Sequence, residues 1–250
     1  MRVIYEPRGR AKEYSELACN WYIGCVHGCR YCFAPGCMRK TAEDWQTEVP
    51  LRANVVELFR KDAEEMQANR DERPILFSFL GDPYQPVEEK YRITRKILRI
   101  VAEFNLHSRI LTKGAYDLVS QDFSLIKRAK TEFGVTICFV DDDLRQEWEP
   151  NAAPVADRFR LLEEAHRRKI PTWVSLEPVI DPDQALSVIR EASPYVDFWK
   201  VGKLNHMKDI EKKVDWRKFY FDVVSLLNSL NAKYYIKKDL VKYASSTREL

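Results

Sequence analysis

Short apolar or β-branched runs alternate along this chain with longer segments in which apolar residues recur at helical spacing. The short runs predict strands at residues 75–79, 108–111, 135–140, 172–176, 198–201 and 233–236, and an apolar run at 21–23 leads into a cysteine-rich loop. The longer segments predict helices over residues 54–69, 92–104, 155–166, 183–189 and 216–230. Six or seven β/α units of this kind predict an α/β fold with a complete or partial barrel of the TIM type.

The composition is that of a folded chain without internal boundaries. Its 250 residues are 45% hydrophobic, enough to bury a full core, and they contain no linker, repeat or low-complexity stretch. We therefore expect a single domain over residues 1–250, with a core at about 15–205 and a C-terminal strand and helix extension over 206–250. The first residues lack the apolar core of a signal peptide, and no apolar run approaches a membrane span. These features predict a cytoplasmic protein without a membrane partner.

The charge balance argues against one class of partner. A formal net charge of +3 is too small to indicate binding to duplex DNA, and nothing before the cysteine loop resembles a duplex-binding module. Residues 200–242 are nevertheless distinctly basic. This basic segment is either a solvated helix face or a phosphate-binding rim.

Three cysteines in one short loop carry the strongest chemical signal: Cys25, Cys29 and Cys32. A closed zinc site usually has two separated Cys-x-x-Cys pairs, and this loop has no such second pair. A four-iron cluster is usually held by four thiolates, so three clustered cysteines leave one iron open to a ligand that binds and leaves. The alternatives are a disulfide cluster in a secreted fold, which the N-terminus disfavours, and a zinc site. The zinc site would be completed by one of three residues: Cys19, Cys37 or His27.

Polar and glycine-bearing segments follow the predicted strands. In a parallel barrel the carboxyl ends of the strands meet at one mouth, where the chemistry takes place. The candidates in these segments are Gly81, Asp82, Tyr84, Gln85, Lys113, Asp141, Glu177, Lys203, Asn205, His206 and Lys237. We therefore expect these residues to gather at one end of the barrel.

The cysteine loop and the strand-end segments together resemble one family. Cys-x-x-x-Cys-x-x-Cys with Tyr31 before the third cysteine is similar to the signature of radical S-adenosylmethionine (SAM) enzymes. Residues 20–32 resemble the cluster loop of the spore photoproduct lyase-like branch, residues 82–86 its second-strand motif and residues 111–113 its third. The resemblance extends from about residue 20 to about residue 205, through Glu149 and Arg158. It implies a partial (β/α)6 barrel of the radical SAM kind.

The resemblance also implies a mechanism. SAM is cleaved reductively to methionine and a 5′-deoxyadenosyl radical, which removes a hydrogen atom from the substrate. The three cysteines would hold a [4Fe-4S] cluster whose open iron chelates SAM, and an electron donor such as flavodoxin or ferredoxin would reduce it. Tyr31 and Phe33 would shield the cluster from water.

The same resemblance places SAM against the strand ends. Gly81 and Asp82 are expected at the methionine amino group and Lys113 at the SAM carboxylate. Asp141 is expected at the ribose hydroxyls. From the residues alone, the alternatives are that Asp82 only caps a turn, that Lys113 is a surface lysine and that Asp141 is part of a solvated acidic turn.

The substrate is expected to differ from a thymine dimer. In the lyase that repairs this dimer in spores, a cysteine near the end of the second strand returns a hydrogen atom, whereas residues 78–82 here contain no cysteine. Cys138 lies in an apolar run on a different strand and is interpreted as a core residue. A compact barrel with a modest basic rim is better suited to a small nucleoside or nucleotide.

Several strand-end residues are candidates for binding such a substrate. They are Tyr84, Trp173, Trp199 and Tyr235 for stacking on a base, Glu177, Asn205 and His206 for its polar edge, and Lys203, Lys237 or Lys238 for a phosphate, with Gln85 as a further substrate candidate. We therefore predict a radical SAM lyase acting on a modified nucleoside or nucleotide, with release of queuine from queuosine or its 5′-phosphate as the specific hypothesis. The alternatives are repair of a crosslinked base in DNA, an iron–sulfur redox sensor or scaffold without SAM turnover, and a zinc-binding regulator.

Overall fold

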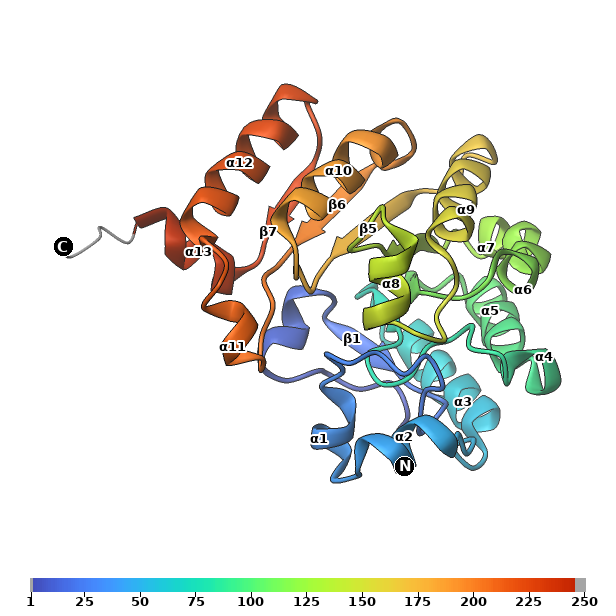
Figure 1. Ribbon diagram of the computed structural model, residues 1–250. Helices are drawn as coiled ribbons and strands as arrows, with labels where there is room; N and C mark the ends of the chain where they lie inside the picture. Colours follow the sequence, from blue (N-terminus) through green and yellow to red (C-terminus); the bar gives the residue numbers. More distant parts are fainter. Residues whose placement is uncertain (1, 246–250) are drawn as a thin grey trace.

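The computed structural model describes residues 2–245 and contains a parallel sheet of seven strands in chain order. The strands are β1 (Leu17–Cys19), β2 (Ile75–Phe77), β3 (Ser108–Thr112), β4 (Glu132–Thr136), β5 (Thr172–Leu176), β6 (Phe198–Val201) and β7 (Tyr234–Ile236). β1 and β7 form the two edges of the sheet, so the barrel is not closed. Figure 1 shows the large helices arranged around the outside of the curled sheet. The prediction of an α/β fold with a partial barrel is confirmed.

Helices connect successive strands, as parallel pairing requires. The α-helices are α1 (Ala34–Met38), α2 (Ala42–Thr47), α3 (Val55–Ala68), α4 (Glu88–Tyr91), α5 (Ile93–Phe104), α6 (Tyr116–Val119), α7 (Phe123–Arg128), α8 (Asp142–Trp148), α9 (Val155–Arg167), α10 (Pro182–Ala192), α11 (Lys208–Glu211), α12 (Trp216–Ser229) and α13 (Lys238–Ser245). Short 3-10 turns are η1 (Gly9–Glu13), η2 (Ser120–Asp122) and η3 (Ser193–Tyr195). Among residues 2–245, no helix is both long and apolar enough to cross a membrane.

Two strands lie earlier in the chain than the apolar runs predict. The first is Leu17–Cys19 and not 21–23, because Cys19 is the residue that pairs with Phe77 of β2. The fourth is Glu132–Thr136 and not 135–140, because pairing with β3 begins at Glu132, opposite Arg109. The remaining apolar residues of both runs are largely buried, but in the loops that follow the strands. Apolar runs alone therefore predict these two strands a few residues too late, because the buried loops that follow the strands are also apolar.

The core has two parts, one on each face of the sheet. The larger part packs the outer face against helices such as α5, whose Ile97, Leu98 and Val101 are fully buried. Each such aliphatic side chain contributes roughly 1.5–3 kcal/mol. The smaller part fills the inner face with Tyr14, Ala18, Leu76 and Trp173. This inner cluster forms a floor inside the half barrel, and it leaves the carboxyl ends of the strands above it.

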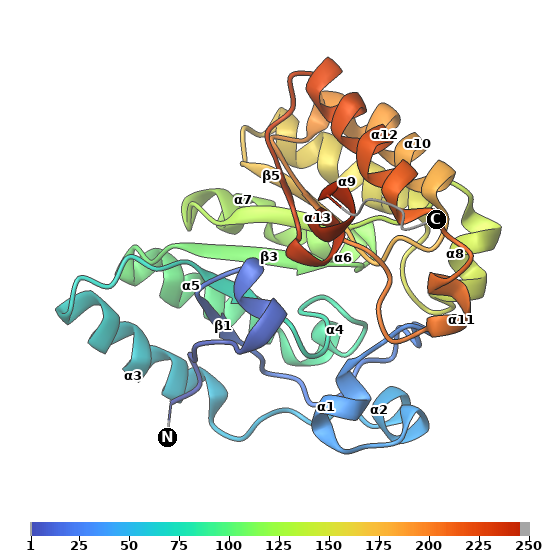
Figure 2. The same cartoon turned by 90° about the vertical axis from the view of Figure 1, so that its left-hand side faces the viewer.

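Residues 8–14, which we call the N-terminal strap, lie between the two edges of the sheet. Lys200 Nζ of β6 donates to the carbonyl oxygens of Glu13 and Tyr14 at 2.8 and 2.6 Å. The Glu13 carboxylate accepts from Tyr235 Oη and from the backbone N–H of Lys238, both at 2.9 Å. Figures 1 and 2 show the strap as the dark blue turn beside β7 and α13. The strap therefore covers the side that the open sheet leaves exposed.

Candidate active site

A cavity of about 630 Å³ lies where the loops after the strands converge. Its volume falls within the range of about 300–1,000 Å³ that is common for ligand pockets. The predicted residues in its lining are Cys25, Cys29, Tyr31, Cys32, Phe33, Gly81, Asp82, Lys113, Glu177, Lys203, Asn205, His206 and Lys237. The parallel topology thus brings together candidates from the loops after β1, β2, β3, β5, β6 and β7.

The cysteine loop follows β1 and wraps one side of this cavity. The backbone N–H of Cys25 donates to the carbonyl of Trp45 at 2.9 Å, and that of Cys32 to the carbonyl of Cys29 at 3.1 Å. Burial raises the pKa of the Cys25 thiol and, despite the opposing charge of Lys113, raises that of Cys29 to about 11. Because ligation requires the thiolate form, a metal centre that binds these cysteines displaces their protons.

The side chains of the site that could bind a metal do not surround a single position. Within the part of the chain that the structure describes, no three histidine, cysteine, aspartate or glutamate side chains are grouped so as to hold a single metal ion. Cys37 is exposed and lies outside the cavity lining, whereas Cys19 and Cys138 are fully buried. Cys25, Cys29 and Cys32 are therefore the three cysteines that reach the cavity.

Gly81 and Gln85 attach the loop after β2 to the cysteine loop. Gly81 has a φ of +77°, and a Cβ atom there would lie 2.8 Å from the carbonyl oxygen of Gly24. The Gln85 amide donates to that same carbonyl at 3.1 Å and accepts from the N–H of Val26 at 3.2 Å. Gln85 is fully buried and does not line the cavity. It braces the two loops, so the structure does not place it where a substrate contact was expected.

The Asp82 carboxylate is occupied by protein donors. Oδ1 accepts from the Tyr84 N–H at 2.8 Å and from Thr112 Oγ1 at 2.6 Å, and Oδ2 accepts from the Lys113 N–H at 2.7 Å. His27 Nδ1 lies 3.6 Å from Oδ2, and burial lowers the pKa of this imidazole. Asp82 therefore joins the ends of β2 and β3, and it borders the cavity while doing so.

Lys113 lies over the ring of Tyr31, with Nζ 5.7 Å from the ring centroid. Burial lowers the pKa of its ammonium group, but attraction to the Glu149 carboxylate, and to Cys29 once that thiol is ionised, outweighs burial and raises the pKa above its usual value. Lys113 is therefore a positive charge held beside the three cysteines.

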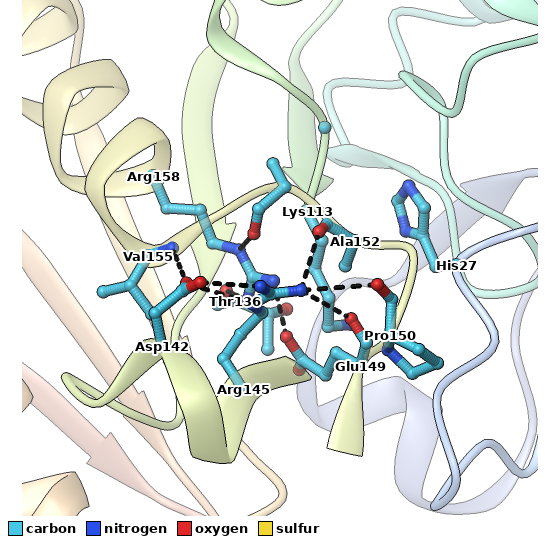
Figure 3. A network of polar contacts seen from close by, with 12 residues as sticks. His27, Lys113, Thr136, Asp142, Arg145, Glu149, Pro150, Ala152, Val155 and Arg158 are labelled. Carbon is cyan, nitrogen blue, oxygen red and sulfur yellow. Dashed lines mark hydrogen bonds and ion pairs between the residues drawn. The ribbon is translucent and has the colours of Figure 1, made fainter. Parts of the chain in front are cut away.

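A buried ion pair lies close to this lysine (Figure 3). Arg158 Nη2 lies 2.5 Å from Glu149 Oε2, and the two side chains are 1% and 0% exposed. Arg158 also donates to the carbonyls of Ala153 and Thr136, both at 3.0 Å, and Tyr31 Oη donates to Glu149. Each of the two charges thus has further polar partners, which a buried pair needs to offset its desolvation.

The segment from 149 to 153 is fastened to the cysteine loop. The N–H of Asn151 donates to the His27 carbonyl at 3.1 Å, and its side-chain amide donates to the Val26 carbonyl at 2.9 Å. On the other side, Arg145 donates to the carbonyls of Glu149 and Ala152 at 3.2 and 3.3 Å (Figure 3). The sequence singles out Glu149 and Arg158 through the resemblance, and the structure shows that they support the cysteine loop.

The opposite wall of the cavity is polar. Tyr14 Oη donates to Glu177 Oε2 at 2.5 Å and lies 2.7 Å from Ser175 Oγ, and Lys237 Nζ donates to the same Oε2 at 2.6 Å. Burial and the neighbouring Glu177 carboxylate raise the pKa of Tyr14, so its hydroxyl keeps its proton. Gly202 gives the glutamate room, because a Cβ there would lie 2.6 Å from Glu177 Cδ.

The loop after β6 contributes a second lysine that already has a partner. Lys203 Nζ lies 2.6 Å from Glu211 Oε2 and donates to the Leu204 carbonyl at 2.7 Å. Asn205 donates to the Lys203 carbonyl at 3.1 Å, and His206 is exposed at the rim. Lys203 and Lys237, both predicted as phosphate ligands, are thus each paired with a carboxylate.

The other candidates lie away from the cavity. Tyr84 is 1% exposed and donates to Asp122, and Asp141 is exposed and caps α8 by accepting from the N–H groups of Asp143 and Leu144. The stacking candidates Trp173 and Trp199 are core residues, and Tyr235 binds Glu13. Asp141 is therefore a helix cap and not a cavity residue, because the chain turns into α8 directly after it.

Sequence reasoning did not find the cavity residues of the strap or of β5. Arg8, Arg10, Tyr14 and Ser175 line the cavity, but none belongs to a recognisable spacing. Tyr14 and Ser175 are brought together by contacts across 161 positions of the chain. The sequence offers only an indirect indication of Ser175. Side chains alternate between the two faces of a strand, so Ser175 lies on the same face as Glu177, two residues later at the end of a predicted strand.

Comparison with known proteins places this geometry in a family. The family model of the radical SAM superfamily matches residues 19–192. The uncharacterized protein MJ0683 of Methanocaldococcus jannaschii is 28% identical over 190 residues, which are 74% of this chain and 69% of that protein. The uncharacterized protein Rv2578c of Mycobacterium tuberculosis is 28% identical over 173 residues, 64% of this chain and 48% of that protein.

Two solved structures share the fold. SuiB of Streptococcus suis bound to S-adenosylmethionine has a TM-score of 0.67 and 13% identity, over 90% of this chain and 51% of SuiB. Spore photoproduct lyase complexed with a dinucleoside spore photoproduct has a TM-score of 0.68 and 11% identity, over 93% of this chain and 79% of the lyase. The chain thus spans about half the length of SuiB and of the mycobacterial relative. It belongs to the radical SAM superfamily, whose enzymes use a [4Fe-4S] cluster and SAM.

Proposed function

We propose that this enzyme uses a 5′-deoxyadenosyl radical to cleave a bond in a modified nucleoside or nucleotide, with release of queuine from queuosine or its 5′-phosphate as the specific candidate. The observation that best supports the proposal is that the cavity has two chemically different sides. Three thiols and Lys113 line one side, and hydrogen-bonding groups from the strap, β5 and β7 line the other. A small polar substrate is the ligand that such a wall binds.

Cys25, Cys29 and Cys32 are the residues that hold the cluster in this proposal. They fit it in number, because three thiolates leave one iron for SAM, and in position, because they reach the cavity while the other cysteines do not. When bound, the cluster and SAM supply the radical that removes a hydrogen atom from the substrate. The electron donor that this proposal requires would be a protein such as flavodoxin or ferredoxin.

The residues beside the cysteines orient SAM. Lys113 offers an ammonium group of retained positive charge to the SAM carboxylate. Gly81 brings backbone close to the methionine end, and Asp82 holds that backbone in place through its bonds to β3. Tyr31, fixed by Glu149, limits the access of water to the cluster.

The polar wall and the rim bind the substrate. Glu177 and Lys237 present a carboxylate and an ammonium group to the cavity, and Asn205 and His206 lie at its edge. Arg8 is exposed in the lining, and no ion pair of this residue is found within residues 2–245. Since Lys203 and Lys237 already have partners, Arg8 is the cation that meets a 5′-phosphate.

The test is the formation of 5′-deoxyadenosine by anaerobically reconstituted enzyme with SAM and dithionite, measured by mass spectrometry. The panel contains queuosine, queuosine 5′-phosphate, unmodified nucleosides and single-stranded DNA. Strong stimulation by a modified nucleoside or nucleotide, with a matching cleaved product, supports the proposal. Stimulation by DNA alone indicates base repair. An intact cluster that yields no 5′-deoxyadenosine with any compound favours a sensor or scaffold and refutes the proposal.

A further inference from the structure

The ion pair between Glu177 and Lys237 borders the cavity, and it has hydrogen-bonding capacity left over. Both residues line the cavity, and their side chains are 15% and 5% exposed. Oε2 of Glu177 receives both Tyr14 and Lys237. Among the described residues, no donor is found for Oε1, and Lys237 Nζ has one acceptor for its three protons. A buried polar network with unfilled positions is costly unless a ligand or water completes it.

We propose that Glu177 and Lys237 form a subsite that binds the amino-lactam edge of a guanine-type base. This inference rests on the proposed function, because it assumes that the substrate is a nucleoside or nucleotide. An amino-lactam edge carries a ring N–H and an amino N–H next to a carbonyl oxygen. The two N–H groups donate to the open lone pairs of Glu177, and the carbonyl accepts the remaining protons of Lys237.

Charge favours this edge over a charged ligand group. The pair is already neutral overall, and Tyr14 supports both members: it donates to Glu177, and Lys237 Nζ lies 4.6 Å from its ring centroid. A ligand ammonium or carboxylate would compete with one member for the other. A neutral amino-lactam adds hydrogen bonds to both without separating them, so no buried charge is left unpaired.

The subsite is built to hold its shape. Tyr14 comes from the strap, Ser175 and Glu177 from the end of β5, and Lys237 from the end of β7. Because the proton of Tyr14 is directed to Glu177, Ser175 Oγ donates to Tyr14 and fixes its hydroxyl. Strand ends and an anchored strap position side chains better than free loops do, and specificity depends on such fixed partners.

The test uses the SAM-loaded holoenzyme and three probes: guanosine, inosine and 2′,3′-dideoxyguanosine. Binding is measured by anaerobic calorimetric titration. Inosine lacks the amino N–H, so it is expected to bind about tenfold more weakly than guanosine, the loss typical of a hydrogen bond to a charged group. Dideoxyguanosine is expected to bind like guanosine. Equal binding of guanosine and inosine, or undetectable guanosine binding at millimolar concentration, overturns the subsite.

A double variant, Glu177→Gln with Lys237→Gln, removes both charges together and leaves no unpaired ion in the wall. It is expected to bind guanosine and inosine equally, while its affinity for SAM without nucleoside stays unchanged. Glu164→Gln, a change of the same kind at an ion-paired glutamate of α9 that does not line the cavity, is the control and should retain the tenfold preference. Weaker SAM binding in the double variant would instead assign the pair to the ribose diol of SAM, and weak binding of dideoxyguanosine would assign it to the diol of the substrate.

The 5′-deoxyadenosine assay separates this inference from the proposed function. Stimulation by a nucleoside without an amino-lactam edge, together with no preference for guanosine, refutes the subsite and retains the function. A clear preference for guanosine with no stimulation by any nucleoside retains the subsite and refutes the function.

Discussion

Gly81 is the residue at which the loop after β2 comes closest to the cysteine loop. Its φ of +77° is one that residues with a side chain rarely adopt, and a Cβ atom would be driven against the Gly24 carbonyl. We expect Gly81→Ala to destabilise the protein by roughly 1–3 kcal/mol through this local strain and to lower the iron content after reconstitution. Urea unfolding of the metal-free protein and iron analysis of the reconstituted protein measure the two effects.

Gly36 provides the matched control for this glycine. It lies in α1, close to the third cysteine, and a Cβ atom there has nothing within 4 Å. Alanine is favoured over glycine in a helix, so Gly36→Ala should be neutral or slightly stabilising and keep its iron. Equal behaviour of the two variants would show that the close approach at Gly81 is not required.

Lys200 is a buried lysine whose charge is unfavourable in the folded state. Burial, aided by Arg109, lowers its pKa to about 7, compared with about 10.4 for a lysine in an unfolded chain. Between these values the unfolded state binds more protons, so the free energy of unfolding rises with pH. We expect the wild-type protein to gain roughly 1–2 kcal/mol relative to Lys200→Met between pH 7 and 8.5.

Urea unfolding of the two metal-free proteins over that pH range tests this expectation. The cysteines of the unfolded chain also titrate above about pH 8.5, but they are common to both proteins and cancel in the difference. A difference in stability that does not change with pH would mean that Lys200 keeps its proton in the fold.

At the scale of the elements, the N-terminal strap is held by contacts from distant parts of the chain. Glu13 accepts two of them, from Tyr235 and Lys238. We expect Glu13→Ala to release the strap at a cost of about 2 kcal/mol, because hydrogen bonds to a charged acceptor are lost. Hydrogen exchange of residues 8–14 should become faster, and stimulation of SAM cleavage by the substrate should require a higher substrate concentration.

The control for the strap is Glu16→Ala. Glu16 is exposed just beyond the strap, so its loss should change neither the exchange rates nor the substrate dependence. SAM cleavage without substrate should be the same in all three proteins, because the cysteine side of the cavity does not contact Glu13. A fall in that basal rate in Glu13→Ala would show that the strap also supports the SAM site.

How much of each element the sequence could predict depended on the kind of signal it carries. Helices α3, α5 and α9 lie within about a residue of their predicted bounds, because each has an apolar stripe of helical period facing the sheet. β1 was misplaced because the buried loop after it is as apolar as a strand. The strap was not predicted at all, since its position is set by Lys200 from 186 residues away and not by local pattern.

The same distinction applies to the cavity. Strand-end position was enough to bring Lys113, Glu177 and Lys237 into its lining, because a parallel barrel places all strand ends at one mouth. Strand-end position did not show that the Asp82 carboxylate would accept hydrogen bonds from the end of β3, or that Asp141 would cap α8. These outcomes depend on which backbone donors lie within reach, and that is decided only when the loops fold.

At the scale of the whole molecule, the cysteine loop is linked to both halves of the barrel. Gln85 joins it to the loop after β2, and Asn151 joins it to the segment before α9, where Glu149 and Arg158 form their buried pair. Both links are made of protein groups, so we expect the loop to keep its position without the cluster. Binding of the cluster to the cysteines should therefore stabilise a protein that is already folded, because the cluster binds only to the native state.

This organisation predicts how SAM acts on stability. SAM at about 100 times its dissociation constant should stabilise the cluster-loaded protein by about 2.7 kcal/mol, and it should stabilise the iron-free protein little, because its ligation needs the open iron. Anaerobic urea unfolding with and without SAM measures this. Cys29→Ala should behave like the iron-free protein, and Cys37→Ala, whose side chain is exposed outside the cavity, like the wild type. Equal stabilisation of the iron-free protein by SAM would place SAM away from the cysteines, and loss of the effect in Cys37→Ala would mean that the ligand set is different.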